Sequence, residues 1–453
     1  MATVHYEITL AELIYSVLLL AGTFLLVWIY QNNKKKSNPI YKWYLPGLFI
    51  KVFGGIALVL VYVFYYDGGD VIAYYYNSKV IVNKLYSDPE VGLQFLIGKN
   101  DPESFSLFRY DTGVPFWYLY KNPQSWAVSR FSVPFVITGL GYILPATIIL
   151  NIVAFIGPWK LTKTLVKLYP NFERNIVVAF LFFPSCVFWG SGLMKDSFTF
   201  SATLWILASV LQIAKFNNKV LINLLIIVIG SYIIINLKPY ILVALLTALP
   251  ILLLLTFINR IRIRFIRYIS VPLISLAVVA GGLYLFSILS SALGMYGSME
   301  EAFEKIVISR EDFINNELYS SNYFDIGAVE PTLSSILSKS HLALLYGLFS
   351  PFPWNVNSAV MLLSAAESLL ILFLFLKMIL LIMFKRRSKL ITNDNVVFSF
   401  LIFVIFFTIF VGVSTANFGA MVRYRIPAYP LFLFILLYVG SKKHDTRVKR
   451  RDH

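Results

Sequence analysis

The sequence predicts an all-α polytopic membrane protein with about 11 transmembrane helices and two longer outer-side intervals that carry interfacial helices. Of its 453 residues, 58% are hydrophobic and only 14% are charged, whereas about a quarter of the residues of a soluble protein are charged. Apolar runs of roughly 20 residues, the length that crosses a bilayer, recur along the chain. A net charge of +16 would favour a nucleic-acid partner in a soluble protein. In a membrane protein it indicates basic residues retained in cytoplasmic loops, so we expect a membrane and no nucleic acid.

The apolar runs set the predicted spans in order. The first, "LIYSVLLLAGTFLLVWIY", has lysines directly after it and no basic region before it, which is typical of a retained span rather than a signal peptide. Two hydrophobic runs on either side of "NLKPY" predict a hairpin. The predicted limits are 11–31, 44–66, 133–158, 175–194, 197–214, 220–236, 239–258, 268–290, 357–384, 395–415 and 424–440.

The charge distribution predicts the orientation of these spans. With the N-terminus outside, every inner segment contains Lys or Arg, and together these segments hold most of the 39 basic residues. Two outer intervals, 67–132 and 291–356, hold most of the 23 carboxylates. We therefore expect one integral membrane domain over 1–453 that ends in a basic cytoplasmic tail, 441–453.

The motif "YYDGGD" places Asp67 and Asp70 directly after the second span, with Gly68 and Gly69 allowing a turn that other residues resist. One interpretation is a solvated turn. The other is a carboxylate near the membrane surface that accepts a proton from a hydroxyl group. The pair could also share a divalent cation through its oxygens. Residues 71–86 that follow suit a helix lying on the bilayer surface.

The stretch "VFWGSGLMKDSFTF" places Lys195 and Asp196 between two apolar runs, at the predicted outer surface. They could form a capping pair, with Lys195 extending to the headgroups. Alternatively, Lys195 binds phosphate while Asp196 orients it, helped by the N-terminus of a helix that starts at Ser197. Pro184 should kink the preceding helix.

The late motif "ANFGAMVRYRIPAYP" places Arg423 and Arg425 on the outer side, where the positive-inside tendency does not favour them. They could contact lipid headgroups. We favour a ligand role, because a guanidinium binds phosphate oxygens in a bidentate way and Asn417 lets the backbone turn towards the ligand. Lys238 of "NLKPY" is a further candidate cation, or a lysine that extends to the headgroups.

Further candidate features lie around "SPFPW", whose two prolines predict a shaped loop at the membrane surface. His341 precedes this loop and is a candidate substrate-binding residue. Glu367 lies deep in a predicted span, where it is either functional or a protonated residue bonded to a neighbouring helix. The single cysteine, Cys186, excludes an intramolecular disulfide.

The patterns "P...WGSG..KDS" and "N.G...RYR.P..P", together with the early acidic motif, resemble bacterial integral-membrane glycosyltransferases of the GT-C type and related polysaccharide polymerases. The resemblance covers the layout of most of the chain. It implies a multi-pass protein of the bacterial inner (plasma) membrane, with its C-terminus in the cytoplasm, that takes a sugar from a polyprenyl-phosphate lipid to a glycan or lipid acceptor on the outer side.

The resemblance implies Asp67 or Asp70 as the base and Lys195, Arg423 and Arg425 as phosphate ligands. Enzymes of this type usually carry the acidic motif after their first span, whereas here it follows the second, so the choice between the two aspartates stays open. The implied chemistry agrees with the residues, since cations stabilise a departing phosphate. An oligosaccharide repeat-unit polymerase and a lipid or solute transporter or scramblase are the alternatives.

Overall fold

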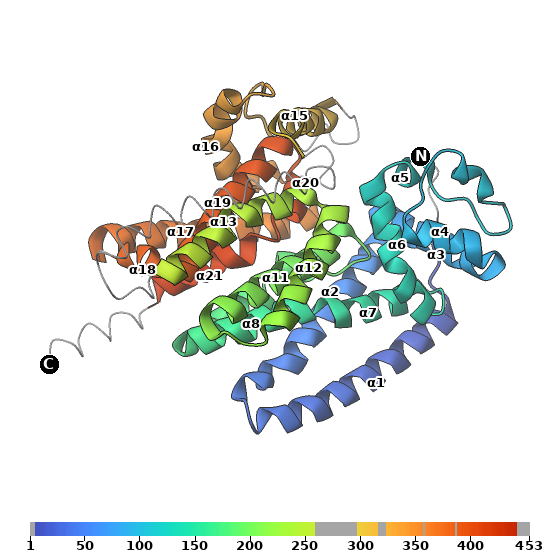
Figure 1. Ribbon diagram of the computed structural model, residues 1–453, viewed down its shortest axis with the longest axis horizontal. Coiled ribbons are helices and arrows are strands. Elements are labelled where there is room, and N and C mark those ends of the chain that lie inside the picture. Colours follow the sequence, from blue (N-terminus) through green and yellow to red (C-terminus); the bar gives the residue numbers. More distant parts are fainter. Residues whose placement is uncertain (1–4, 259–296, 316–322, 357, 386, 442–453) are drawn as a thin grey trace. The chain divides into compact units, whose positions relative to one another are not determined.

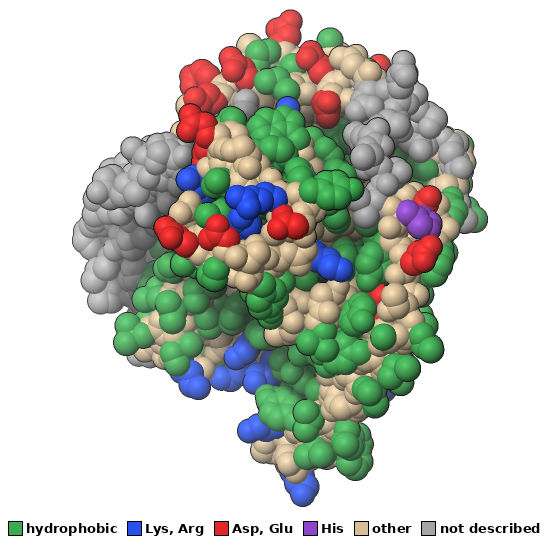
Figure 2. All heavy atoms as spheres, turned by 90° about the vertical axis from the view of Figure 1, so that its right-hand side faces the viewer, with side chains coloured by type: hydrophobic (Ala, Val, Ile, Leu, Met, Phe, Trp, Pro, Cys, Tyr) green, Lys and Arg blue, Asp and Glu red, His purple; other side chains and the backbone are tan. Residues whose placement is uncertain are grey.

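The computed structural model describes residues 5–258, 297–315, 323–356, 358–385 and 387–441. Helices make up the fold throughout these residues, and no strand forms among them beyond an isolated bridge between Tyr323 and Asn417 (Figure 1). Hydrophobic side chains cover much of the face in Figure 2, between groups of carboxylates and basic side chains. This combination of helices and apolar surface is what an all-α membrane protein requires.

The chain divides into two compact units. The first comprises Met1–Lys167, Leu181–Ala208 and Ile226–Lys238. Its elements are α1 (Leu10–Lys35), η1 (Pro39–Trp43), α2 (Tyr44–Phe64), α3 (Asp70–Ser87), α4 (Pro89–Ile97), η2 (Ser104–Leu107), α5 (Trp117–Tyr120), α6 (Pro123–Thr138), α7 (Ile143–Ala154), nearly all of α8 (Ile156–Leu168), α10 (Pro184–Trp189), the first part of α11 (Lys195–Phe216) and the last part of α12 (Val220–Leu237).

The second unit comprises Leu168–Phe180, Ser209–Leu225 and Pro239–His453. Its central helix is α19, which contacts α13, α15, α16 and α21. Its elements are η3 (Pro170–Phe172), α9 (Glu173–Leu181), α13 (Pro239–Ile258), α15 (Met299–Asn315), α16 (Leu333–Phe349), η6 (Pro353–Asn355), α17 (Ala359–Lys385), α18 (Lys389–Thr392), α19 (Asn395–Ser414), α20 (Phe418–Tyr424) and α21 (Tyr429–Gly440).

Among the described residues, eight helices are long and apolar enough to cross a membrane, or nine if the bent pair α20 and α21 counts as one span. The protein is therefore a multi-pass membrane protein, as the composition predicts. The predicted span 268–290 lies outside the described residues, as does nearly all of the basic tail. The predicted number of eleven spans is thus not reached within the described part of the chain.

Three of the predicted spans differ from the helices that form. The run 424–440 is shorter, because α21 begins at Tyr429 after the bend from α20. The run 133–158 is interrupted after α6, because Leu140 and Gly141 adopt positive φ angles of 54° and 75°. The span-length segment begins at Ile143 instead. The run 175–194 is divided between α9 and α10, and Pro184 occupies the first turn of α10. Pro184 was predicted to kink one continuous helix, whereas it begins a new helix after a break.

The helix predicted to lie on the bilayer, α3, is packed into the first unit instead. Eleven of its eighteen residues are buried, on every side of the helix. Its most extensive packing is against α6, and α4 also packs against it. Apolar residues at mixed helical spacing cannot distinguish a surface helix from a buried one, because both need an apolar face.

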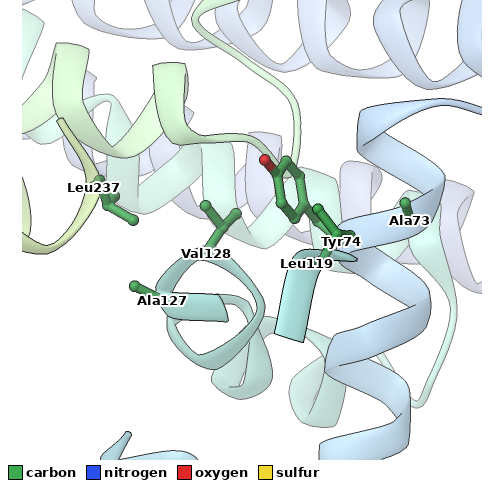
Figure 3. Packing of buried hydrophobic residues seen from close by; sticks show 6 residues of the cluster. All are labelled: Ala73, Tyr74, Leu119, Ala127, Val128 and Leu237. Carbon is green, nitrogen blue, oxygen red and sulfur yellow. The ribbon is translucent and has the colours of Figure 1, made fainter. Parts of the chain in front are cut away.

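A compact apolar cluster joins four helical elements of the first unit. Figure 3 shows Tyr74 of α3 projecting towards Val128 of α6 and Leu119 of α5, with Leu237 of α12 beyond Val128. All four side chains are almost fully buried. Phe198 of α11 packs against the cluster. We call these residues, with Ala73 and Ala127, the Tyr74 cluster.

Candidate functional site

The acidic motif forms the turn that its glycines predict. Asp67, Gly68 and Gly69 adopt φ angles of 48°, 134° and 96° in succession, and α3 starts at Asp70. A Cβ on Gly69 would lie 3.0 Å from the Tyr62 ring. The turn therefore depends on glycine both for its conformation and for its packing.

The two aspartates have different surroundings. Asp67 is exposed, and its Oδ1 lies 2.7 Å from His5 Nδ1. Asp70 is half-buried in the first turn of α3, one turn before Tyr74. Only Asp70 is therefore attached directly to the helix that enters the Tyr74 cluster.

The cationic corner contains a buried ion pair. Lys238 Nζ donates to Asp196 Oδ1 at 2.6 Å, and the two residues are 5% and 1% exposed. Lys238 thus does not extend to the headgroups, because its partner holds it in the interior. One interpretation of the sequence was that Asp196 orients Lys195. In the structure, Asp196 forms its ion pair with Lys238, which follows α12.

Lys195 takes a different direction at the same corner. Its Nζ donates to Ser125 Oγ of α6 at 3.1 Å, and the side chain is half-buried. Helix α11 begins at Lys195, two residues earlier than predicted, which is within the ordinary variation of helix boundaries. Lys195 is therefore held near α6 while its neighbour Asp196 is held near the end of α12.

The acidic and cationic corners converge within the first unit. A Cβ on Gly192 would lie 2.5 Å from Leu58 Cδ2 and 3.4 Å from Val71 Cγ2. The glycine loop before Lys195 therefore touches the first turn of α3, next to Asp70. Leu237 and Phe198, close in sequence to Lys238 and Asp196, pack on the Tyr74 cluster. Motifs that are far apart in the sequence thus lie around one apolar cluster of the first unit.

The remaining predicted residues belong to the second unit. Arg425 is fully buried, and its guanidinium donates to Ser368 Oγ at 3.0 Å and to the backbone carbonyls of Gly347 and Ser350. It also stacks 3.9 Å from the centre of the Tyr429 ring. These contacts hold α16, α17 and α21 together, and a phosphate would have to displace them.

Asn417 and its neighbours form the entry to α20. Asn417 is the N-cap of this helix, and its side chain accepts a hydrogen bond from the Ala420 N–H at 2.9 Å. Arg310 of α15 donates to the carbonyls of Thr415 and Phe324, each at 3.3 Å, and burial lowers the pKa of its guanidinium. The backbone turn predicted for Asn417 is thus fixed by a cap and by an arginine from the second outer interval.

Arg423 and His341 are more accessible. Arg423 is half-buried in the last turn of α20, and His341 is exposed on α16. The two arginines of "RYR" therefore differ: Arg425 is enclosed by protein groups, while Arg423 keeps part of its surface open.

Three polar residues with notable contacts or burial were not predicted from the sequence. Ser125 accepts a hydrogen bond from Lys195, and Arg310 donates one to the carbonyl of Thr415, just before α20. Arg130 is a buried cation of α6. Serines are too common to single out, and both arginines lie in segments predicted to be exposed. Only the position of Arg130 between apolar residues, in "SWAVSRFSVPF", offered a signal.

The fold and its spans define a multi-pass helical membrane protein. Within the described ranges, no three His, Cys, Asp or Glu side chains are grouped so as to hold a metal ion. Comparison of the chain with protein-family models, with curated proteins and with solved structures finds no match.

Proposed function

We propose that this protein is a membrane glycosyltransferase that moves a sugar from a polyprenyl-phosphate-linked donor to a glycan or lipid acceptor on the outer side of the membrane. The observation that carries the proposal is the meeting of Asp70, Lys195 and the Lys238–Asp196 pair around the Tyr74 cluster. A carboxylate and a cation beside an apolar cluster supply the two groups that transfer from a lipid phosphate needs.

In the proposed reaction the acceptor hydroxyl oxygen forms a bond to the anomeric carbon of the sugar. The bond between this carbon and the phosphate oxygen breaks, and the phosphate leaves with the electron pair. Asp70 takes the hydroxyl proton, and Lys195 binds the phosphate as its negative charge grows. The half-buried position of both residues limits the water that would weaken these interactions.

The structure changes the roles that we assign to the neighbouring residues. Asp196 and Lys238 neutralise each other, so we propose that this pair joins the start of α11 to the end of α12 rather than binding phosphate. Ser125 positions Lys195. Because Arg425 is enclosed by carbonyl groups, we propose a structural role for it and keep Arg423 as the second-unit candidate for phosphate binding.

Sugar transfer by the purified protein in lipid vesicles tests the proposal. Asp70→Asn should slow transfer by about a hundredfold to ten-thousandfold, the usual effect of losing a general base. Asp67→Asn is the matched control, because this aspartate is exposed and paired with His5, and it should keep most of the activity. Equal rates for the wild type and a folded Asp70→Asn protein would refute the assignment of the base.

Lys195 is tested by a graded pair of variants. Lys195→Ala should weaken lipid-phosphate binding and slow transfer together, because the same ammonium acts before and during departure of the phosphate. Ser125→Ala removes one hydrogen bond worth about 1 kcal/mol and should slow transfer by up to about tenfold. Normal lipid-phosphate binding and normal sugar transfer by Lys195→Ala would refute phosphate binding by Lys195, which would then serve only at the start of its helix.

The bend between α20 and α21 favours a second candidate, a lipid or solute transporter. These helices meet at 72° and together form one broken span or a re-entrant segment, a feature of transporter sites. In this protein, however, the guanidinium of Arg425 occupies carbonyls beside the break. Movement of a labelled lipid or sugar across vesicles that contain an inactive Asp70→Asn protein would favour transport over transfer.

A further inference from the structure

A buried cation of the first unit has no hydrogen-bonding or oppositely charged partner among the described residues. Arg130 of α6 is 8% exposed, and none of its nitrogens makes a hydrogen bond or an ion pair within the described part of the chain. Its Nε is completely enclosed. The nearest favourable contact is the Phe131 ring, whose centre is 5.9 Å from the guanidinium carbon.

A guanidinium in this position needs a counter-charge. Arginine does not lose its proton in proteins, although burial lowers the pKa of Arg130. Removing an unpaired charge from water is costly. A cation–π contact returns only a small part of that cost. The buried contacts of Arg130 therefore leave most of this cost unbalanced.

The surroundings of Arg130 indicate what kind of anion would fit. The backbone of Gly98, at the end of α4, makes room for the guanidinium, since a Cβ there would lie 2.6 Å from Nη1. Just before this glycine, α4 exposes Leu93 and Ile97, which are 53% and 74% exposed and one helical turn apart. Lys99, directly after it, is exposed.

The other side of Arg130 adjoins a predicted span. The ring of Phe131 lies 6.1 Å from that of Tyr232, which is 55% exposed on α12. Helix α12 is one of the apolar helices long enough to cross a membrane. An exposed tyrosine near the end of such a helix is typical of the headgroup region.

We propose that Arg130 binds the phosphate group of a membrane phospholipid, whose acyl chains lie against Leu93 and Ile97. The fork of the guanidinium binds phosphate oxygens in a bidentate way. The exposed apolar residues of α4 then contact the chains, as on an interfacial helix. This lipid site does not depend on the proposed sugar transfer. It also places the membrane-surface contact of the first outer interval on α4, rather than on the buried α3.

The test uses the full-length protein in mild detergent, with phosphatidylglycerol as the added lipid. Its readouts are the thermal unfolding midpoint and the phospholipid retained in native mass spectrometry. Phosphatidylglycerol should raise the midpoint of the wild type, whereas diacylglycerol, which lacks the phosphate, should not. Inorganic phosphate at the same concentration should also fail to do so, because it has no chains for Leu93 and Ile97.

Arg130→Met should abolish the lipid-dependent rise, with Lys121→Met, which removes an exposed lysine of the same interval, as the control. Without added lipid, Arg130→Met should unfold at the same temperature as the wild type or at a higher one, since the substitution removes an uncompensated charge. If Arg130→Met does not fold, Arg130→Lys keeps the charge without the fork and should weaken lipid retention by about tenfold.

Three results would overturn the proposal. One is an equal rise with phosphatidylglycerol and diacylglycerol. Another is an equal rise with inorganic phosphate, which would make the site one for a free anion. The third is an unchanged lipid-dependent rise and unchanged phospholipid retention in folded Arg130→Met or Arg130→Lys.

Discussion

Replacement of Lys238 by methionine should destabilise the protein more than any exposed substitution. At the 2.6 Å separation of Lys238 Nζ and Asp196 Oδ1, the attraction is about 6 kcal/mol at an effective dielectric constant of 20, before the cost of desolvation. The variant would leave the Asp196 carboxylate buried without this partner. We expect a loss of about 3 to 5 kcal/mol in the free energy of unfolding, as for other buried pairs that lose one member.

The assay is reversible unfolding in mixed micelles, applied as a double-mutant cycle. Lys238→Met and Asp196→Leu should each be strongly destabilising, while the double variant should recover much of the loss, because no unpaired charge remains. Ser37→Ala, at an exposed position in the connection after α1, is the control. Additive losses in the double variant would show that the two side chains do not act as a pair.

Two further predictions concern the second unit and the orientation in the membrane. Arg425→Met should lose about 1 to 3 kcal/mol for each carbonyl group left unsatisfied, whereas Arg423→Met should change thermal stability little, and a common unfolding midpoint would refute this difference. In a Cys186→Ser background, an impermeant thiol reagent should label Tyr110→Cys in intact cells but Ser37→Cys only after lysis, and the reverse pattern would invert the predicted topology.

Several features of the fold are readable from the sequence because they depend on local chemistry. Glycines specify the turn before Asp70, and Pro184 specifies the break between α9 and α10. The hydrophobic content of each run identifies membrane helices regardless of what they contact. The interruption at Leu140 and Gly141 was also local, but the apolar residues on both sides concealed it in the predicted span.

The partners of charged side chains are not readable in the same way, because they depend on packing between distant segments. The adjacent residues Lys195 and Asp196 suggested one pair, yet Lys195 donates to Ser125 and Asp196 accepts from Lys238. Likewise, the repeated arginines of "RYR" gave no indication that Arg425 would be enclosed. Successive residues of a helix point in directions about 100° apart, and tertiary contacts decide which of them is buried.

The most direct test of the proposed site is a cryo-electron microscopy structure of the protein with a polyprenyl phosphate added in lipid nanodiscs. We expect density for the phosphate beside Lys195 Nζ, on the side of the Tyr74 cluster that carries Asp70, with the isoprenoid chain leaving into the bilayer. A well-defined phosphate bound elsewhere, with Lys195 still donating to Ser125 and remote from any ligand, would contradict it.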